Sequence, residues 1–360
     1  MRILYGVQGT GNGHTTRARA MAPALAAEGL EVDYLFSGRE AEDYFDMEPF
    51  GDYALRSGLT MVIESGQIKV LKTLAQAAPL SFIREVRNLD VSPYDLILTD
   101  FEPVTAWAGN FSQVPVLGLG HQYAFRYPIP QHRGGLHQRM IMKYFAPAKQ
   151  ALGFHWHHFD MPILPPIAPV QRAGDDKDRD LIVVYLPFED PQDIEKLLAP
   201  YKRYRFVVYH PLSRTPQQDH VQWHLPSRDK FHQHLVRCNG VLCNAGFELT
   251  SEVLQLGCKL LVKPVRGQSE QISNAIALRH IGLGYSMSTL DAEHFDEWLG
   301  DARGVKVKYP DVARAVAKWI VAGDHEDNSN LAAMLWRKTR FPDKPLFDAT
   351  DADPYFSRPG

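Results

Sequence analysis

Residues 240–275 read GVLCNAGFELTSEVLQLGCKLLVKPVRGQSEQISNA, and this stretch predicts the fold. Two short apolar runs, Val241–Cys243 and Leu260–Val262, have the length and composition of buried strands. Between them Leu249–Leu256 has helical spacing, and Gly257 ends the predicted helix. A strand, a helix and a strand of these lengths form a βαβ unit. The chain is therefore expected to contain an open α/β sheet.

The turn before the predicted helix is suited to an anionic ligand. Gly246 can adopt a positive φ and let a ligand approach the backbone. The free N–H groups of the first helical turn then lie at the positive end of the helix dipole, which favours phosphate. Glu252 is too far into the helix to cap it, but its carboxylate can accept two hydrogen bonds from a ribose diol. The polar residues Glu270 and Gln271 follow the second strand, at the sheet edge where α/β proteins bind ligands.

This stretch resembles the donor-binding signature of GT-B glycosyltransferases of families 1 and 28. These families include the UDP-GlcNAc transferase of peptidoglycan synthesis and the UDP-glucuronosyl- and UDP-glucosyltransferases. The signature has the form Gly-x-x-x-Thr-x-Glu, then Pro, then (Asp/Glu)-Gln-x-x-Asn-Ala. The matching residues are Gly246, Thr250, Glu252, Pro264, Glu270, Gln271, Asn274 and Ala275. An ordinary βαβ unit whose polar residues only cap helices is the alternative interpretation.

The resemblance implies a nucleotide-sugar site in the second half of the chain. The turn would hold the pyrophosphate, Glu252 the ribose, and Glu270 and Gln271 the sugar hydroxyls, while a loop at Leu225 and Ser227 would hold the base. The donor-binding residues implied in this way are Asn244, Gly246, Phe247, Thr250, Glu252, Glu270, Gln271, Leu225 and Ser227. Asn244 stands where many family 1 enzymes have histidine. Tyr185–Glu189 replaces the Gly-Gly-Ser loop of family 28, so the turn at 244–247 is expected to carry more of the phosphate contacts.

Composition indicates an ordinary globular protein without a nucleic-acid partner. The length of 360 residues suggests two domains, and the net charge of −3 provides no basic field for nucleic acid. The three cysteines have no zinc-site or disulfide spacing, which favours reduced thiols. No apolar run approaches the ~20 residues of a spanning helix, and Met1 leads directly into a predicted strand without a signal peptide. These features predict a cytoplasmic protein whose only membrane contact is peripheral.

The first forty residues also have a βαβ pattern, with Gly9, Gly11 and Gly13 in the turn. The third glycine of a dinucleotide fingerprint would fall at His14, and no Gly-Lys-Ser/Thr follows, so NAD and ATP binding are disfavoured. Histidine titrates near neutrality and can remove a proton from a hydroxyl group. In the resembled families this loop lies at the interdomain cleft and supplies a histidine base. The resemblance therefore implies that His14 is the catalytic base and that Gly11, Asn12 and Gly13 line the acceptor site. A helix cap or a cleft-lining side chain is the alternative for His14.

Polar residues also follow two later predicted strands of this half. Tyr94–Thr99 ends in Asp100 and Glu102, and Val114–Leu119 ends close to His121. Asp100 is predicted to orient a protonated His14, as the third group of a catalytic relay does. Family 1 enzymes often pair an aspartate from this region with their histidine. Glu102 is the alternative to Asp100 in this orienting role, and Glu102 and His121 are predicted acceptor contacts. A helix N-cap is the other interpretation of either carboxylate.

Residues 103–159 contain no Asp or Glu and interleave basic with aromatic side chains. Such a patch suits an anionic acceptor or anionic lipid headgroups, so residues 121–150 are a candidate peripheral membrane contact. A solvated face of a helix over roughly 136–152 is the alternative. The histidines of His155–His158 have poor spacing for a metal. No metal and no cofactor are expected.

We therefore expect an α/β protein of GT-B type, with two Rossmann-like domains facing across a cleft. Residues 1–165 would bind the acceptor, 178–325 the nucleotide sugar, and 326–360 would pack back on the first domain. The predicted activity is inverting transfer from a nucleotide-diphosphate sugar, UDP-linked by resemblance, to a hydroxyl of a sugar, lipid, small molecule or cell-envelope glycan. A nucleotide-sugar 2-epimerase of the same fold and a non-catalytic nucleotide-sugar or polysaccharide-binding protein are the alternatives.

Overall fold

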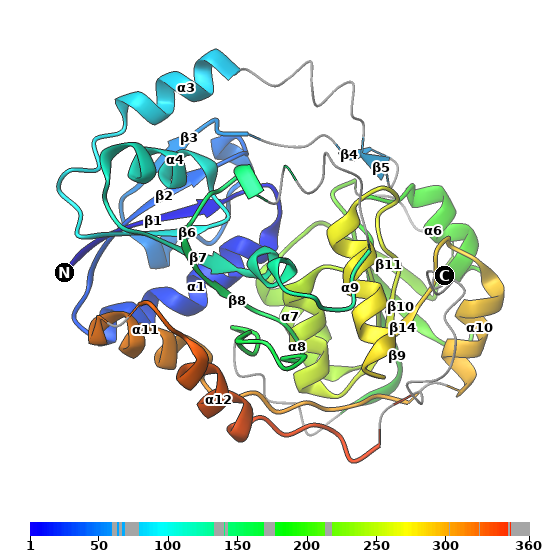
Figure 1. Cartoon of the computed structure of the whole chain (residues 1–360). Helices are drawn as coiled ribbons and strands as arrows, with labels where there is room; N and C mark the ends of the chain where they lie inside the picture. Colours follow the sequence, from blue (N-terminus) through cyan, green and yellow to red (C-terminus); the bar gives the residue numbers. More distant parts are fainter. Residues whose placement is uncertain are drawn as a thin grey trace.

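Two six-stranded parallel sheets, each covered by helices, make up the protein (Figure 1). The computed structural model describes residues 1–59, 63–64, 67–68, 79–132, 140, 143–168, 177–212, 218–301, 303–323, 325–344 and 346. The chain passes from the first sheet to the second between Gly153 and Asp178. The predicted α/β architecture with two Rossmann-like domains is confirmed.

The first sheet has the strand order β3-β2-β1-β6-β7-β8. Its strands are β1 (Arg2–Gln8), β2 (Glu31–Ser37), β3 (Tyr53–Arg56), β6 (Leu96–Asp100), β7 (Val116–Gly120) and β8 (Gln150–Gly153). The helices of this half are α1 (Asn12–Ala27), α3 (Pro79–Asn88), α4 (Pro103–Ser112) and the short 3-10 helices η1 (Ala41–Asp43), η2 (Glu48–Phe50) and η3 (His121–Arg126). A separate hairpin joins β4 (Ile63–Glu64) and β5 (Gln67–Ile68).

The second sheet has the order β11-β10-β9-β12-β13-β14. Its strands are β9 (Asp178–Tyr185), β10 (Arg205–Tyr209), β11 (Val221–His224), β12 (Cys238–Cys243), β13 (Lys259–Val262) and β14 (Tyr285–Ser286). Its helices are α6 (Pro191–Leu198), α7 (Arg228–Arg237), α8 (Phe247–Leu256), α9 (Ser269–His280) and α10 (Ala292–Asp301). Numbered from its own first strand, each sheet has the order 3-2-1-4-5-6 of a dinucleotide-binding fold. The central strands are continuous apolar runs because both faces of each sheet are covered.

The last two helices return to the first half of the molecule. Helix α11 (Val312–Ala322) packs on α1, and α12 (Ser329–Lys338) follows it along the lower edge in Figure 1. Trp336 Nε1 donates to the Ile163 carbonyl at 2.6 Å, and Asn328 Nδ2 donates to the Pro162 carbonyl at 2.8 Å. The predicted domain bounds stay a prediction, but α11, which we assigned to the second domain, contacts the first.

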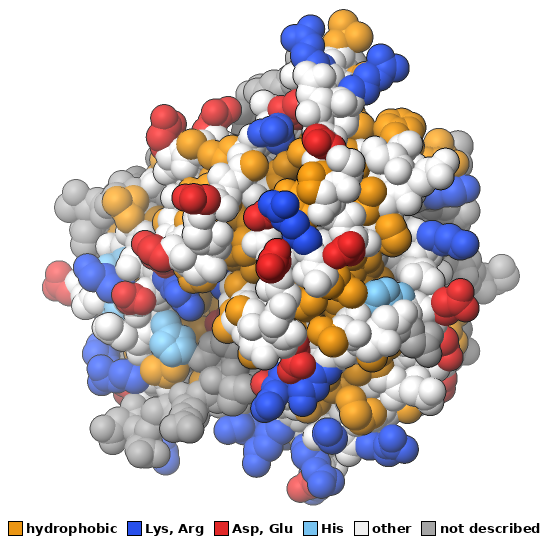
Figure 2. Space-filling model, turned by 90° about the vertical axis from the view of Figure 1, so that its left-hand side faces the viewer, with side chains coloured by type: hydrophobic (Ala, Val, Ile, Leu, Met, Phe, Trp, Pro, Cys, Tyr) orange, Lys and Arg blue, Asp and Glu red, His pale blue; other side chains and the backbone are white. Residues whose placement is uncertain are grey.

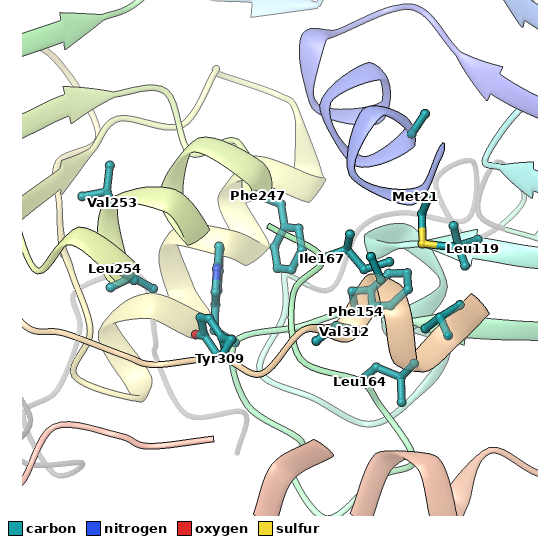
Figure 3. Close-up of a cluster of buried hydrophobic side chains, with 14 of the residues drawn as sticks. Met21, Leu119, Phe154, Leu164, Ile167, Phe247, Val253, Leu254, Tyr309 and Val312 are labelled. Atoms are coloured by element: carbon teal, nitrogen blue, oxygen red, sulfur yellow. The ribbon is translucent and has the colours of Figure 1, made fainter. Parts of the chain in front are cut away.

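One hydrophobic core runs through both sheets and the interface between them. It joins Met21 of α1 and Leu119 of β7 to Val253 and Leu254 of α8, with Phe247 lying between the two groups (Figure 3). The domains are therefore held together by apolar burial as well as by polar contacts.

The structure corrects one element expected in the basic segment. Gln150–Gly153 forms β8, which extends the sheet beside β7, so the helix expected over roughly 136–152 does not reach its predicted end. Residues 136–139 and 141–142 lie outside the described part. In the residues that the structure covers, no helix has both the length and the apolar character needed to cross a bilayer.

Candidate active site

The predicted acceptor and donor segments meet at the domain interface. Strand order reverses between β1 and β6 in the first sheet and between β9 and β12 in the second. Ligands of open α/β sheets bind beyond the carboxyl ends of the strands at such reversal points. Helix α1 follows β1, α8 follows β12, and these two helices contact each other. Both predicted ligand-binding turns therefore lie at one place in the molecule.

His14 and Asp100 form a close pair at this place. His14 lies in the first turn of α1 and Asp100 ends β6. His14 Nδ1 is 2.6 Å from Asp100 Oδ1; the His14 side chain is 15% exposed and that of Asp100 is fully buried. An ionised carboxylate only accepts hydrogen bonds, so we assign the proton to Nδ1, which leaves the Nε2 lone pair available. This is the geometry of a histidine base oriented by a carboxylate.

Arg17, which the sequence analysis did not single out, completes this pair. Its Nε donates to Asp100 Oδ2 at 2.7 Å and its Nη2 donates to Asp100 Oδ1 at 2.5 Å. Burial alone would raise the pKa of Asp100, but the charges and hydrogen bonds of Arg17 and His14 lower it below its usual value. Asp100 is therefore ionised at neutral pH. The missed signal was spacing, because Arg17 is three residues after His14 and lies on the same helical face.

Arg17 also reaches the second domain. Its Nη1 donates to Glu248 Oε1 in the first turn of α8. Burial raises the pKa of Glu248, although Arg17 and His14 act in the opposite direction. A Cβ on Gly13 would lie 2.8 Å from Glu248 Oε2, so glycine permits this close approach of α1 to α8. Glu248 was also missed, although it stands only two residues after Gly246.

The other predicted acceptor residues of the glycine loop lie at the same interface. Gly11 is the N-cap residue of α1, and a Cβ placed on it would meet nothing within 4 Å. Asn12 Nδ2 donates to the Tyr185 hydroxyl at 3.3 Å, and Arg39 Nη1 donates to Asn12 Oδ1 at 3.0 Å. Gly11 thus borders open space, while Asn12 joins the two domains.

Glu102 has a different place from the one predicted. It is the N-cap of α4, where its carboxylate accepts from the backbone N–H groups of Val104 at 2.8 Å and Thr105 at 2.7 Å. The hydroxyls of Thr105 and Ser37 also donate to it, and it has no exposed surface. Burial raises its pKa, against the effect of these hydrogen bonds. The helix-cap alternative therefore describes Glu102, whose carboxylate is buried and hydrogen-bonded within the first domain.

His121 also lies inside the interface rather than on an open surface. It is 1% exposed, its Nδ1 lies 2.8 Å from the Phe154 carbonyl, and its Nε2 lies 2.6 Å from Asn274 Oδ1. Its ring stacks on Phe247 at 3.9 Å with an interplanar angle of 6°. Burial lowers the pKa of His121, so the ring is neutral near pH 7. His121 therefore joins the two domains from a buried position, and its predicted contact with an acceptor stays a prediction.

The donor helix α8 begins as predicted, but its first turn has several buried side chains. Gly246 has φ −74°, so the expected positive φ is wrong, whereas a Cβ on it would meet nothing within 4 Å. No side chain caps this helix start. Phe247 is 3% exposed and Thr250 is fully buried, so these two residues shape the turn from within. The space beside Gly246, at the N-terminus of α8, is therefore open.

Glu252 lies farther along α8 in a partly buried position. Burial, together with the charge of Glu248, raises its pKa to about 7, while Arg228 acts in the opposite direction. A carboxyl group with this pKa changes charge close to neutral pH, which makes it a candidate functional group.

The residues after β13 connect the domains as well. Gln122 Nε2 of η3 donates to Glu270 Oε2 at 3.0 Å. Gln271 Oε1 accepts from the Val265 backbone N–H at 2.8 Å and is largely buried. Glu270 is therefore in contact with the first domain, and Gln271 holds the loop that precedes α9.

A buried ion pair lies beneath the turn that contains Asn244. Lys263 Nζ is 2.7 Å from Glu189 Oε2, and Asn244 Nδ2 donates to Glu189 Oε1 at 3.2 Å and to the Lys263 carbonyl at 2.9 Å. Asn244 Oδ1 is buried and has no hydrogen-bond partner among the described residues. Glu189 and Lys263 were not predicted, although both follow central strands of the second sheet.

The predicted base-binding loop precedes α7. Leu225 is 56% exposed, and Ser227 is the N-cap residue of α7 without a side-chain capping bond. Both positions therefore have surface available to a ligand. Among the described residues, no three or more His, Cys, Asp and Glu side chains are grouped as metal ligands.

This fold is that of GT-B glycosyltransferases. Spinosyn forosaminyltransferase SpnP has a similar structure, with a TM-score of 0.56, 11% identity, and coverage of 94% of this chain and 99% of that one. MurG of Acinetobacter baumannii has a TM-score of 0.53 with 14% identity over 89% of this chain and 99% of its own. The glycotransferase of kitacinnamycin has a TM-score of 0.54 with 14% identity, over 94% and 99% of the two chains.

The chain belongs to glycosyl transferase family 1, whose family model matches residues 1–301. It is similar to an uncharacterized glycosyltransferase of Methanosarcina acetivorans, with 27% identity over 127 residues. A protein of Methanosarcina mazei with the same description is 28% identical over 127 residues. These matches cover 34% of this chain and 32% and 34% of the relatives, so the chain matches about a third of their length.

Proposed function

We propose that the protein is an inverting glycosyltransferase that moves a sugar from a nucleotide-diphosphate sugar, a UDP-sugar by family resemblance, to an acceptor hydroxyl. The observation that carries this proposal is the 2.6 Å contact between His14 Nδ1 and Asp100 Oδ1 beside the start of α8. At this place an oriented histidine lies next to a helix N-terminus that is suited to a diphosphate.

In the proposed reaction, His14 Nε2 takes the proton of the acceptor hydroxyl. The acceptor oxygen bonds to the anomeric carbon as the bond from that carbon to the diphosphate oxygen breaks. Asp100 stabilises the imidazolium that forms, because it is ionised and buried against His14. The departing nucleoside diphosphate takes the negative charge, and backbone N–H groups near Gly246 stabilise it without a metal ion.

The donor would lie along the second domain. The open space beside Gly246 suits the pyrophosphate, and the partly buried Glu252 carboxylate suits the ribose hydroxyls. Leu225 and Ser227 border the place proposed for the base, and Glu270 that for the sugar. Because Gln122 and Arg17 already reach the second domain, a bound donor would contact groups from both halves.

We also propose that the protein works in the cytoplasm and contacts anionic membrane through residues 121–150. Met140 and Tyr144 are 49% and 44% exposed, Phe111 of the adjoining α4 is 68% exposed, and Lys143 and Lys149 are exposed beside them. Trp107 Nε1 donates to the Tyr144 carbonyl at 3.1 Å, which connects the two segments. On the side that carries the first domain, Figure 2 shows hydrophobic side chains interspersed with Lys and Arg and also with Asp and Glu.

Vesicle sedimentation tests this contact. The protein should sediment with vesicles that contain anionic phospholipid at low ionic strength, and high salt should release it because the charges are then screened. Vesicles of neutral phospholipid are the control. Equal sedimentation with both vesicle types, or none with either, would contradict the membrane proposal.

A calorimetric titration with UDP, GDP, TDP and CMP tests the donor site. One of these nucleotides should bind with micromolar affinity, and Glu252→Ala should weaken that binding at least about tenfold if two ribose hydrogen bonds are lost. His14→Ala should retain the binding and lower turnover with the matching nucleotide sugar by ~10²–10⁴, the usual range for a general base.

The other outcomes distinguish the alternatives. Binding to none of the four nucleotides would exclude a nucleotide-sugar enzyme. Conversion of the nucleotide sugar without an acceptor would indicate a 2-epimerase, and binding without any turnover would indicate a binding protein. A collapse of nucleotide binding in His14→Ala would contradict the role of that residue as base.

A further inference from the structure

We propose that Arg17 is a positioning residue that orients the catalytic pair and links it to the donor helix. Arg17 holds the Asp100 carboxylate against His14, and its ion pair with Glu248 connects this pair to the start of α8. This inference rests on the proposed function, because it assigns His14 as the base.

The contacts of Arg17 are divided between two carboxylates in different domains. Two of its nitrogens donate to the two oxygens of Asp100, at 2.7 and 2.5 Å, and the third donates to Glu248. The side chain of Arg17 is only 1% exposed. A buried guanidinium with all three nitrogens engaged has one orientation available, so Asp100 is held in one orientation as well.

A planar guanidinium suits this place better than an ammonium group. Its fixed fork binds both oxygens of Asp100 and still directs one nitrogen toward Glu248. Lysine is a point charge with a tetrahedral head, and it cannot hold a carboxylate by two parallel hydrogen bonds. Arginine at position 17 therefore provides geometry in addition to positive charge.

The orientation of Asp100 decides which nitrogen of His14 is free. Asp100 Oδ1 accepts from His14 Nδ1 and from Arg17 Nη2, and these two donors lie 3.2 Å from each other. While Asp100 stays ionised and in place, Nδ1 carries the proton and Nε2 is the basic nitrogen. A displaced carboxylate would allow the other tautomer, in which Nε2 carries the proton and cannot accept one.

The link to Glu248 connects this orientation to closure of the two domains. Glu248 belongs to the first turn of α8, where the diphosphate is proposed to bind. If the domains separate, Arg17 loses Glu248, and one of its three anchoring contacts is gone. The pair is therefore best ordered when the first and second domains are in contact.

Nitrogen NMR of the histidine ring tests the positioning role without any substrate. In the wild-type protein, the His14 signals should show the Nδ1–H tautomer, and Arg17→Gln should shift them to a mixture of both tautomers. Arg19→Gln is a matched control, because Arg19 lies on the same helix but donates to the carbonyls of Phe45 and Asp46. This control should leave the His14 signals unchanged.

Kinetics provide the second measurement. Arg17→Gln should lower kcat about 10²-fold, the effect of a misplaced catalytic group, and change KM for the donor less than about threefold. Arg17→Lys, which retains the charge if the glutamine variant fails to fold, should recover only part of kcat. Adding Glu248→Gln to Arg17→Gln should cause no further loss in kcat, because Glu248 acts on the catalytic pair through Arg17.

Two results would overturn the proposal. An unchanged His14 tautomer in both Arg17 variants would show that Asp100 needs no arginine. Losses in kcat that multiply in the double variant would show that Glu248 acts independently of Arg17. Because the NMR result requires no activity, a failure of the transferase function would be recognised separately by the absence of nucleotide binding.

Discussion

At the scale of single residues, Glu252 combines a proposed ligand contact with an unfavourable environment. Its pKa of about 7 means that burial and the nearby Glu248 disfavour the charged form in the folded protein. Two hydrogen bonds from a ribose would favour that charged form. A carboxyl group with so perturbed a pKa is common at functional sites.

Replacement of Glu252 by glutamine should therefore stabilise the free protein at alkaline pH. A folded pKa of about 7 against an ordinary 4.5 corresponds to a loss of roughly 3 kcal/mol in the free energy of unfolding once Glu252 is ionised. We reduce this loss to about 1–2 kcal/mol because the side chain is partly exposed. The wild type binds an extra proton when folded, so its stability falls as pH rises from 4.5 to 7. Glu252→Gln avoids this loss, and urea unfolding from pH 4 to pH 8 measures it.

The difference in the free energy of unfolding between Glu252→Gln and the wild type should be largest at pH 8 and vanish below about pH 4.5. Glu297→Gln, an exposed substitution on α10, is the control for the loss of one carboxylate. A Glu252→Gln variant that is less stable than the wild type at pH 8 would mean that the carboxylate is charged and well paired in the folded protein.

At the scale of elements, local patterns could predict the two βα turns but not every side chain beside them. The apolar runs and glycines at 3–13 and 240–257 predicted strands and helices where the structure has β1, α1, β12 and α8. These signals are local, because periodicity and helix caps depend on neighbouring residues. The structure places Gly246 directly before α8, as predicted, but α1 already begins at Asn12, so Gly13 and His14 lie in its first turn and not in the preceding loop.

The end of β6 shows where such local reasoning stops. Asp100 and Glu102 looked equivalent in the sequence, yet Asp100 joins His14 and Glu102 caps α4. Phe101 between them has φ 52°, an unusual conformation for a bulky residue. This turn separates the two carboxylates, and its strain is held by the surrounding packing. A conformation that depends on tertiary packing leaves no periodic signal in the sequence.

The interface residues could not be predicted for a related reason. His121, Arg17 and Glu248 have partners 153 or 231 positions away in the chain. Spacing within one element says nothing about a residue on the opposite domain. His121 consequently looked like an open acceptor contact, whereas its ring is covered by Phe247 and hydrogen-bonded to Asn274.

At the scale of the whole molecule, the extent of the domain interface argues for cooperative unfolding. Phe247 of the second domain packs against His121 and lies 4.9 Å, centroid to centroid, from the ring of Trp156. Trp156 Nε1 also donates to Ser251 Oγ at 2.9 Å. Since one hydrophobic cluster includes residues of both sheets, unfolding of either domain exposes apolar surface of the other.

The wild-type protein should therefore unfold in one calorimetric transition, and Phe247→Ala should divide it into two. Removal of this buried ring should destabilise the protein by about 3–5 kcal/mol. The interaction that it weakens is the packing between the two domains. Phe206→Ala removes an equally buried ring from the core of the second domain alone. It should lower the melting temperature while the single transition remains, because the interface is intact. Two separate transitions in the wild type would mean that the domains are coupled weakly, and closure would then require the donor rather than precede it.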